Sequence, residues 1–246
     1  MRVRLRFSKM GKVRFTSHRD VARVWERALR RAQLPVATSA GFNPRAKVHF
    51  GLALPTGYES LGEYLDVDFR DELDPAALPD LLTPLLPDGI VVEAAAAIAT
   101  SETSLQQAVT SCTWTIEALG LEADQIEAEV ERLLAAERLD LTRQRKGHDV
   151  TDDVRPYVLE LAVDGPVPAV SSLGGERTIL PAGVRLEAEL GTQPRGLRPS
   201  ELLAALGVPA EGRVRRNHQW ITTDGARHEP LLAGATSAAP ALGWAS

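Results

Sequence analysis

The amino-acid sequence predicts an α+β fold with two successive domains and a disordered C-terminal tail. Short segments in which apolar and polar residues alternate indicate half-buried strands, and longer segments with apolar residues at helical spacing indicate helices. The order strand, helix, strand, strand, helix, strand occurs twice along the 246 residues, without a convincing repeat of the residues themselves. That order is the βαββαβ arrangement of a ferredoxin-like domain, so the predicted fold class is two such domains in tandem.

The first domain is predicted over residues 1–100. It begins with an alternating strand at 1–7, whose open face carries Arg2, Arg4 and Arg6. The helix after it starts at Ser17, which fits the N-cap, and ends before Pro35. Its buried stripe is Val21, Val24, Trp25, Ala28, Leu29 and Ala32. The later elements are strands at 35–39 and 47–54, a strand at 63–69, a short helix at 75–86 and a strand at 89–98.

The second domain is predicted over residues 108–223, with its elements in the same order. They are a strand at 111–119, a helix at 124–137, strands at 157–163 and 184–190, a helix at 199–206 and a strand at 212–222. Residues 224–246 are rich in Ala, Gly, Pro and Ser, a composition that favours disorder over packing. We therefore predict that 224–246 form a flexible tail.

Charge is strongly segregated along the chain. The first fifty residues hold thirteen Arg or Lys and only two acids, Asp20 and Glu26, although the whole chain has a formal net charge of −5. Residues 51–142 reverse the sign, with nineteen acids against three arginines. Such segregation is typical of a protein that presents one face to a polyanion, which points to RNA or another phosphate-rich ligand.

The basic helix is the first candidate binding element. Its arginines are Arg19, Arg23, Arg27, Arg30 and Arg31, and the three arginines of the first strand add to the same local charge. Because few acids are available to pair with them, we expect these arginines to bind backbone phosphates, although a solvated surface is the simpler alternative. His18 at the helix start could contact a phosphate, act as a general acid or base, or merely pack. Ser17 and Asp20 are expected to support the helix as its cap.

The loop at 41–47 is the second candidate. Gly41 provides a backbone conformation that other residues avoid, and Asn43 with the proline after it sets a turn. Phe42 either packs into the core or offers a stacking surface to a base. Arg45 and Lys47 are the predicted phosphate donors, with Asn43 as a hydrogen-bonding group.

Other polar residues are assigned supporting roles. Glu63 is expected to pair with an arginine of the helix or loop, in preference to joining His49 in a metal site. Asp153 and Arg155 are expected to support a salt-bridged hairpin that also holds Lys146 and His148, the alternative being a second anion contact. Arg213, Arg215 and Arg216 form a small basic cluster near Trp220. No zinc-ligand spacing and no Gly-rich phosphate loop occurs, so we expect no metal ion and no cofactor.

Composition excludes several other classes. The single cysteine, Cys112, allows no intramolecular disulfide and no iron–sulfur cluster held by this chain alone. No apolar run of about 18–20 residues occurs, and the N-terminus lacks an apolar signal core, so we expect a cytoplasmic protein with no membrane partner.

Six strings of the sequence match the pattern of a known family. They are R-L-R-F-S-K-M-G-K-V-R-F-T-S-H-R-D at 4–20, E-R-A-L-R-R-A at 26–32, S-A-G-F-N-P-R-A-K at 39–47, L-P-T-G-Y-E-S-L-G-E-Y-L-D-V at 54–67, D-D-V-R-P-Y at 152–157 and L-R-P-S-E-L-L-A-A-L-G at 197–207. On these strings, residues 1–222 resemble the radical SAM-linked protein family, a domain of unknown function found fused to, or encoded near, radical SAM proteins.

The resemblance implies association with RNA-modifying or RNA-processing systems. With one cysteine the chain is similar to the linked module and not to the radical SAM catalyst, which needs three. In the family's loop the positions of Arg45 and Ala46 are usually His-Pro, so this chain carries a guanidinium there instead. The tandem plan is also similar to that of CRISPR repeat-processing endoribonucleases, by analogy of fold alone.

These observations predict an RNA-binding accessory module for tRNA or rRNA that works with a separate radical SAM or RNA-processing enzyme. The predicted contacts are His18, Arg19, Arg23, Arg27, Arg30, Arg31, Gly41, Phe42, Asn43, Arg45 and Lys47. One alternative is a metal-independent endoribonuclease that uses His18, with Arg45 or Lys47 stabilising charge at phosphorus. Another is a protein–protein adaptor that binds no RNA.

Overall fold

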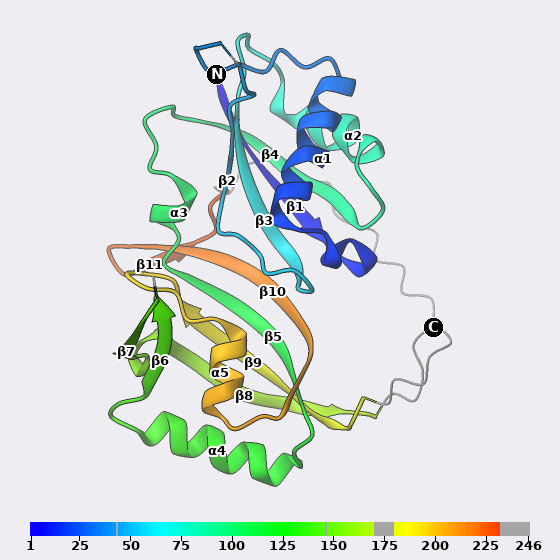
Figure 1. Cartoon of the computed structure of the whole chain (residues 1–246). Helices are drawn as coiled ribbons and strands as arrows, with labels where there is room; N and C mark the ends of the chain where they lie inside the picture. The colour runs from blue at the N-terminus through cyan, green and yellow to red at the C-terminus, as the bar shows by residue number, and fades with distance from the viewer. Residues whose placement is uncertain (43, 146, 170–179, 232–246) are drawn as a thin grey trace. The chain divides into compact units, whose positions relative to one another are not determined.

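The computed structural model describes residues 1–42, 44–145, 147–169 and 180–231 (Figure 1). The chain divides into two compact units. The first unit is Met1–Val109 together with Gln219–Ser246, and the second is Thr110–His218. Both units contain antiparallel strand pairs together with a few helices, so the predicted α+β class is confirmed. The finer assignment, two ferredoxin-like domains in tandem, stays a prediction.

The sheet of the first unit is built around its first strand. Its strands are β1 (Arg2–Lys9), β2 (Val48–Phe50), β3 (Glu59–Asp68) and β4 (Ile90–Ile98). β1 lies between β4 and β3, and β2 pairs with the end of β3. The register places Val3 opposite Val67 and Leu5 opposite Leu65, so the apolar side chains of β1 and β3 share one face.

The helices of the first unit are one long helix and several short ones. They are η1 (Gly11–Phe15), α1 (His18–Arg31), η2 (Pro75–Ala77), α2 (Leu78–Leu82), η3 (Thr83–Leu85) and α3 (Leu105–Ala108). The predicted helix at 75–86 is thus one short α-helix between two 3-10 turns. The prolines within it explain the interruption, since proline lacks the N–H that continues a helix.

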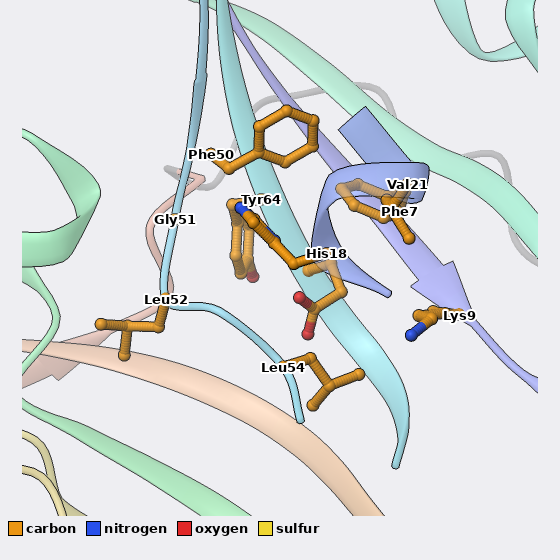
Figure 2. Close-up of a pocket in the computed structure, with 10 residues that line it drawn as sticks. Phe7, Lys9, His18, Val21, Phe50, Gly51, Leu52, Leu54 and Tyr64 are labelled. Carbon is orange, nitrogen blue, oxygen red and sulfur yellow. The ribbon is translucent and has the colours of Figure 1, made fainter. Parts of the chain in front are cut away.

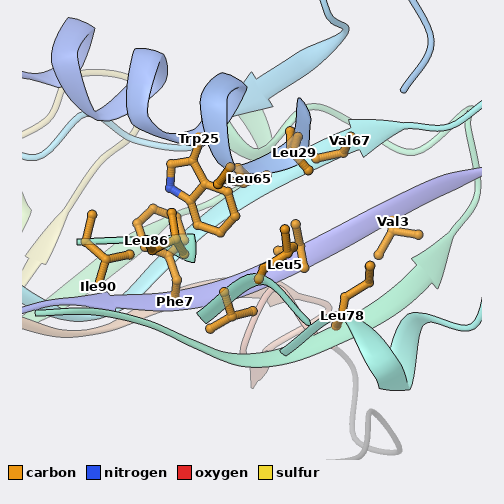
Figure 3. Close-up of a cluster of buried hydrophobic side chains, with 14 of the residues drawn as sticks. Val3, Leu5, Phe7, Trp25, Leu29, Leu65, Val67, Leu78, Leu86 and Ile90 are labelled. Atoms are coloured by element: carbon orange, nitrogen blue, oxygen red, sulfur yellow. The ribbon is translucent and has the colours of Figure 1, made fainter. Parts of the chain in front are cut away.

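The core of the first unit lies between α1 and the sheet. Val21, Trp25, Ala28 and Leu29 form the buried stripe of α1. The ring of Trp25 meets that of Phe7 edge-on, with 4.9 Å between centroids (Figure 3). Because this stripe is fixed against the sheet, the arginines between its members are directed away from the core.

The second unit contains one strand pair outside the βαββαβ order, at the place where the sequence predicted a hairpin. Its elements are β5 (Ser111–Leu119), α4 (Ala123–Ala135), β6 (Asp140–Arg145), β7 (His148–Asp153), η4 (Arg155–Tyr157), β8 (Val158–Val167), β9 (Gly183–Gly191), α5 (Pro199–Ala205) and the residues of β10 (Ala210–Thr223) up to His218. β9 lies between β5 and β8. β6 and β7 form a separate two-stranded hairpin inserted into the predicted order.

Three predicted segments differ from the structure in the first unit. The strand expected at 35–39 consists only of isolated bridges, Val36 with Phe69 and Thr38 with Ala46, and the strand at 47–54 is reduced to β2. The expected tail, 224–246, begins with paired residues, because β11 (Ala226–His228) forms a hairpin with β10. Residues 232–246 of that predicted tail lie outside the described residues.

The helices of the chain are short compared with a bilayer-spanning helix. Within the described ranges, none is both long enough and apolar enough to cross a membrane.

Candidate functional site

α1 begins at a well-formed N-cap. The Ser17 hydroxyl accepts a hydrogen bond from the Asp20 amide at 3.2 Å and donates to the Asp20 carboxylate at 2.7 Å. That hydroxyl contact, followed by the guanidinium of Arg23, lowers the pKa of Asp20, which therefore stays ionised. The cap and the buried stripe together fix the rotation of the helix, and with it the direction of every arginine on its surface.

The arginines of α1 divide into two sets. Arg19, Arg23 and Arg30 line a groove of about 610 Å³ that α1 forms with the segment at 34–46. Arg27 and Arg31 are exposed on the same helix but do not line that groove. Residues 19, 23, 26 and 30 recur at the spacing of one helix face, which explains why this set lies together. From the sequence, all five arginines were expected to bind phosphates equally. In the structure, only three of them line the groove.

The segment at 34–46 contributes the opposite wall and one further cation. Its lining residues are Leu34, Val36, Thr38, Pro44, Arg45 and Ala46. The Ser39 amide donates to the Arg45 carbonyl at 2.8 Å, and the Arg45 amide donates to the Ser39 hydroxyl at 3.1 Å. These two hydrogen bonds close the loop and hold the backbone of Arg45 at the groove. Lys47 is exposed but does not line it.

The tip of this loop carries Gly41 and Phe42. Gly41 has a φ of +127°, a conformation that favours glycine, as the sequence predicted. Phe42 is fully exposed, so the alternative in which it packs into the core is wrong. Asn43 lies outside the described residues.

The charge of the groove is mostly uncompensated. Glu26 is the one acid among the lining residues, against four arginines. Arg23 pairs with Asp20 at 3.0 Å, and both side chains are more than half exposed. No ion pair joins Arg19, Arg30 or Arg45 to another residue in the described part of the chain. The groove therefore presents several guanidiniums to whatever binds in it.

His18 lies in a different hollow. Its ring contacts that of Phe50 edge-on, with 5.2 Å between centroids, in a pocket of about 20 Å³ that Lys9 and Glu63 also line (Figure 2). A space of that size holds about one water molecule. Lys9 is nearly buried and donates to the carbonyls of Arg14 and Thr16. The structure thus separates His18 from the groove arginines with which the sequence grouped it.

Glu63 is nearly buried on β3, in the same pocket as His18. None of the α1 arginines lines that pocket. The predicted ion pair between Glu63 and an arginine of the helix or loop stays a prediction.

The arginines of β1 do not form an open basic face, and that prediction is wrong. Arg4 is fully buried and makes two hydrogen bonds to Asp66, at 2.8 and 3.0 Å, across the β1–β3 ladder. Arg2 pairs in the same way with Asp68, and this hydrogen bond lowers the pKa of Asp68. The physical reason is that β1 is a central strand, so its polar face meets acids of its neighbours instead of solvent.

Arg6 and Arg4 also hold the C-terminal end of the first unit. Arg6 pairs with Glu229 at 2.9 Å and with Glu93 at 3.3 Å. Arg4 donates to the carbonyl of Pro230 at 2.9 Å. All three β1 arginines are therefore neutralised inside the unit and add nothing to the charge of the groove.

The polar residues singled out in the second unit make local contacts. The Asp153 carboxylate accepts from the amides of Leu139 and Arg155, and these hydrogen bonds lower its pKa. Arg155 donates to the carbonyls of Val158 and Leu134. Lys146 lies outside the described residues.

The small basic cluster of the second unit faces acids. Arg213 and Arg215 line a hollow of about 330 Å³ together with Asp164, Glu117 and Glu187. Its mixed charge makes it a weaker candidate for a polyanion than the groove. Within the described ranges, no group of three or more His, Cys, Asp or Glu is arranged to hold a metal ion.

Sequence reasoning missed the apolar part of the groove. Leu29, Leu34, Val36 and Pro44 lie among its arginines. The helical spacing of residues 19, 23, 26 and 30 could have separated the two sets of arginines. Nothing local in the sequence indicates that the segment at 34–46 lies against that face.

Fold and site together define a mixed α+β protein with a basic surface groove on its first unit. The chain belongs to a family described as an uncharacterized protein conserved in bacteria, DUF2344, whose sequence model matches residues 2–192. The match includes α1, the loop and every residue that lines the groove. No curated protein matches the chain.

Proposed function

We propose that the first unit binds RNA, of the tRNA or rRNA class, in the groove between α1 and the segment at 34–46. The observation that carries the proposal is the convergence of Arg19, Arg23, Arg30 and Arg45 on one groove from two separate parts of the chain. The planar guanidinium binds phosphate oxygens through two parallel hydrogen bonds, which makes arginine well suited to an RNA backbone.

The local excess of positive charge supports a polyanionic ligand. The four guanidiniums outnumber the two acids beside them, Glu26 and Asp20, so they repel one another, and bound phosphates would relieve that repulsion. The net charge of the chain is negative, so the attraction is a property of this groove and not of the whole protein.

We propose a binding module in preference to a nuclease. The position of His18 supports this choice, because its imidazole lines a water-sized pocket and not the groove. A general acid or base must come within hydrogen-bonding distance of the reacting group, and RNA bound in the groove would have to extend beyond the groove to meet the exposed His18.

The proposed partner is a separate radical SAM or RNA-processing enzyme to which the module presents its RNA. The resemblance of the N-terminal strings to the radical SAM-linked family supports this part. The single cysteine supports it as well, since the chain by itself cannot supply the thiolates of a radical SAM cluster.

Retention of total cellular RNA on the purified protein tests the proposal. Wild type is compared with a groove variant in which Arg19, Arg23, Arg30 and Arg45 are replaced by Ala, at about 50 and about 200 mM salt. Four phosphate contacts predict a fall in affinity of about 50-fold over that range, from a slope of about −0.7 per contact. We expect wild type to retain intact RNA and the groove variant to lose it.

Two other results would identify the alternatives. Shortened RNA that becomes intact with His18→Ala favours the endoribonuclease. Absence of RNA on wild type at both salt concentrations overturns both RNA hypotheses and leaves the adaptor.

A further inference from the structure

We infer that the groove takes an unpaired segment of RNA, with a base stacked on Phe42, and that it does not take a duplex. The inference rests on the proposed RNA binding and names the form of RNA involved. Three features carry it: apolar side chains in the groove lining, the short length of the groove along α1, and an exposed aromatic ring at the tip of the adjoining loop.

Part of the groove lining is apolar. Leu34, Val36 and Pro44 line the groove together with the arginines. Phosphates gain nothing from such surface, whereas the faces of unpaired bases pack well against it. In an A-form duplex the bases are stacked on one another, and the deep, narrow major groove keeps side chains from reaching them. These apolar side chains therefore favour a segment whose bases are splayed out.

The size of the groove fits a short single strand. Its volume of about 610 Å³ lies in the range of pockets that hold small molecules. From Arg19 to Arg30 the helix rises about 16 Å, at 1.5 Å per residue. A wall of that length is long enough for a short segment of a single strand.

Phe42 lies on the same loop as Pro44 and Arg45, which line the groove. The hydrogen bonds between Ser39 and Arg45 close the loop and leave Phe42 at its exposed tip. Because Phe42 precedes Pro44 by two residues, their Cα atoms lie within about 7 Å of each other. An exposed phenyl ring beside guanidiniums is the usual combination in single-strand binding, where the ring stacks a base and the cations hold its phosphates.

The other highly exposed phenylalanine provides the matched control. Phe15 is also exposed, but the guanidinium of Arg14 covers its ring at 4.7 Å. Within the described part of the chain, no aromatic or cation–π contact involves Phe42. Phe42→Ala and Phe15→Ala remove the same side chain, and neither disturbs the core.

Fluorescence anisotropy with two RNA probes tests the inference. The probes are a mixed-sequence single strand of about ten nucleotides and the blunt duplex of the same sequence. We expect wild type to bind the single strand at least tenfold more tightly than the duplex. Phe42→Ala should weaken single-strand binding by about 5-fold to 100-fold, the range for loss of one base–aromatic stack. Its salt slope should equal that of wild type, because no charge is removed.

Further variants make the result specific. Phe42→Trp, which retains a stacking face, should keep the affinity of wild type, and Phe15→Ala should do the same. Equal affinity for duplex and single strand, or unchanged binding by Phe42→Ala, overturns the inference. The proposed RNA binding still stands in that case if the groove variant binds RNA more weakly than wild type. No binding of either probe by wild type would instead overturn the proposed function itself.

Discussion

Arg4 and Arg23 lie nineteen residues apart and have opposite surroundings. The Arg4 side chain is fully buried against Asp66, whereas the Arg23 side chain is more than half exposed. Alternation along the first seven residues predicts correctly that the arginines of β1 share one face. It does not reveal that acids of β3 and β4 lie on that face, because strand neighbours come from distant parts of the chain.

Removal of Arg4 should be far more damaging than removal of Arg2 from the same strand. Arg4→Ala leaves the carboxylate of Asp66 buried without its partner, at a cost of about 3–5 kcal/mol in the free energy of unfolding. The pair of Arg2 with Asp68 is partly exposed, so Arg2→Ala should cost only about 1 kcal/mol. Urea denaturation measures both. Equal losses would contradict the buried ion pair.

At the scale of the element, α1 is the best-predicted part of the chain. Its N-cap and its buried stripe follow from local sequence and are present as expected. The division of its arginines into two sets does not follow, since it depends on the segment at 34–46. That segment forms isolated bridges in place of the predicted strand, with β2 as its only regular continuation.

The sequence predicted a hairpin around Lys146 and His148, but it did not identify β6 and β7 as strands. Both strands are mostly polar, and none of their described side chains is buried. A hairpin without a buried face leaves no alternation of apolar and polar residues, which is the signal that identifies strands in a sequence.

Gly89, at the start of β4, should tolerate alanine poorly. Its φ is +91°, its carbonyl accepts from the Met10 amide at 2.7 Å, and an added Cβ would lie 2.1 Å from the Met10 carbonyl oxygen. We expect Gly89→Ala to lower the free energy of unfolding by at least about 3 kcal/mol, from backbone strain and the lost hydrogen bond.

Gly57 provides the control for Gly89. Its φ of +96° is similar, but an added Cβ would meet nothing within 4 Å. Gly57→Ala should therefore cost only the conformational strain of about 1–2 kcal/mol. If urea denaturation gives equal losses in the free energy of unfolding for the two variants, the close approach of Gly89 to Met10 does not contribute to stability.

At the scale of the whole molecule, composition predicted too early a start for the C-terminal tail. The Ala, Gly and Pro content of 224–246 predicts a tail that starts directly after the last strand. Residues 226–230 are instead paired or bonded within the first unit, through β11, Glu229 and Pro230. Their partners, Arg4 and Arg6, lie more than 220 residues earlier, a distance that no local pattern spans.

Two shortened chains test this return of the C-terminus. A chain that ends at His228 lacks the Glu229 and Pro230 contacts that a chain ending at Leu231 keeps, and both lack 232–246. The shorter one should be less stable by about 1–3 kcal/mol, since a hydrogen bond of buried Arg4 loses its acceptor. Identical urea midpoints for the two chains would mean that Arg4 and Arg6 do not need these partners.

The salt dependence of RNA binding by two double variants of α1 tests the central claim most directly. Arg23→Ala with Arg30→Ala changes the groove, whereas Arg27→Ala with Arg31→Ala removes the same charge from the same helix outside it. With a single-stranded probe, the groove pair should reduce the slope of log affinity against log salt by about 1.4, and the second pair should leave it unchanged. Equal reductions by both pairs, or none by either, would contradict binding in the groove.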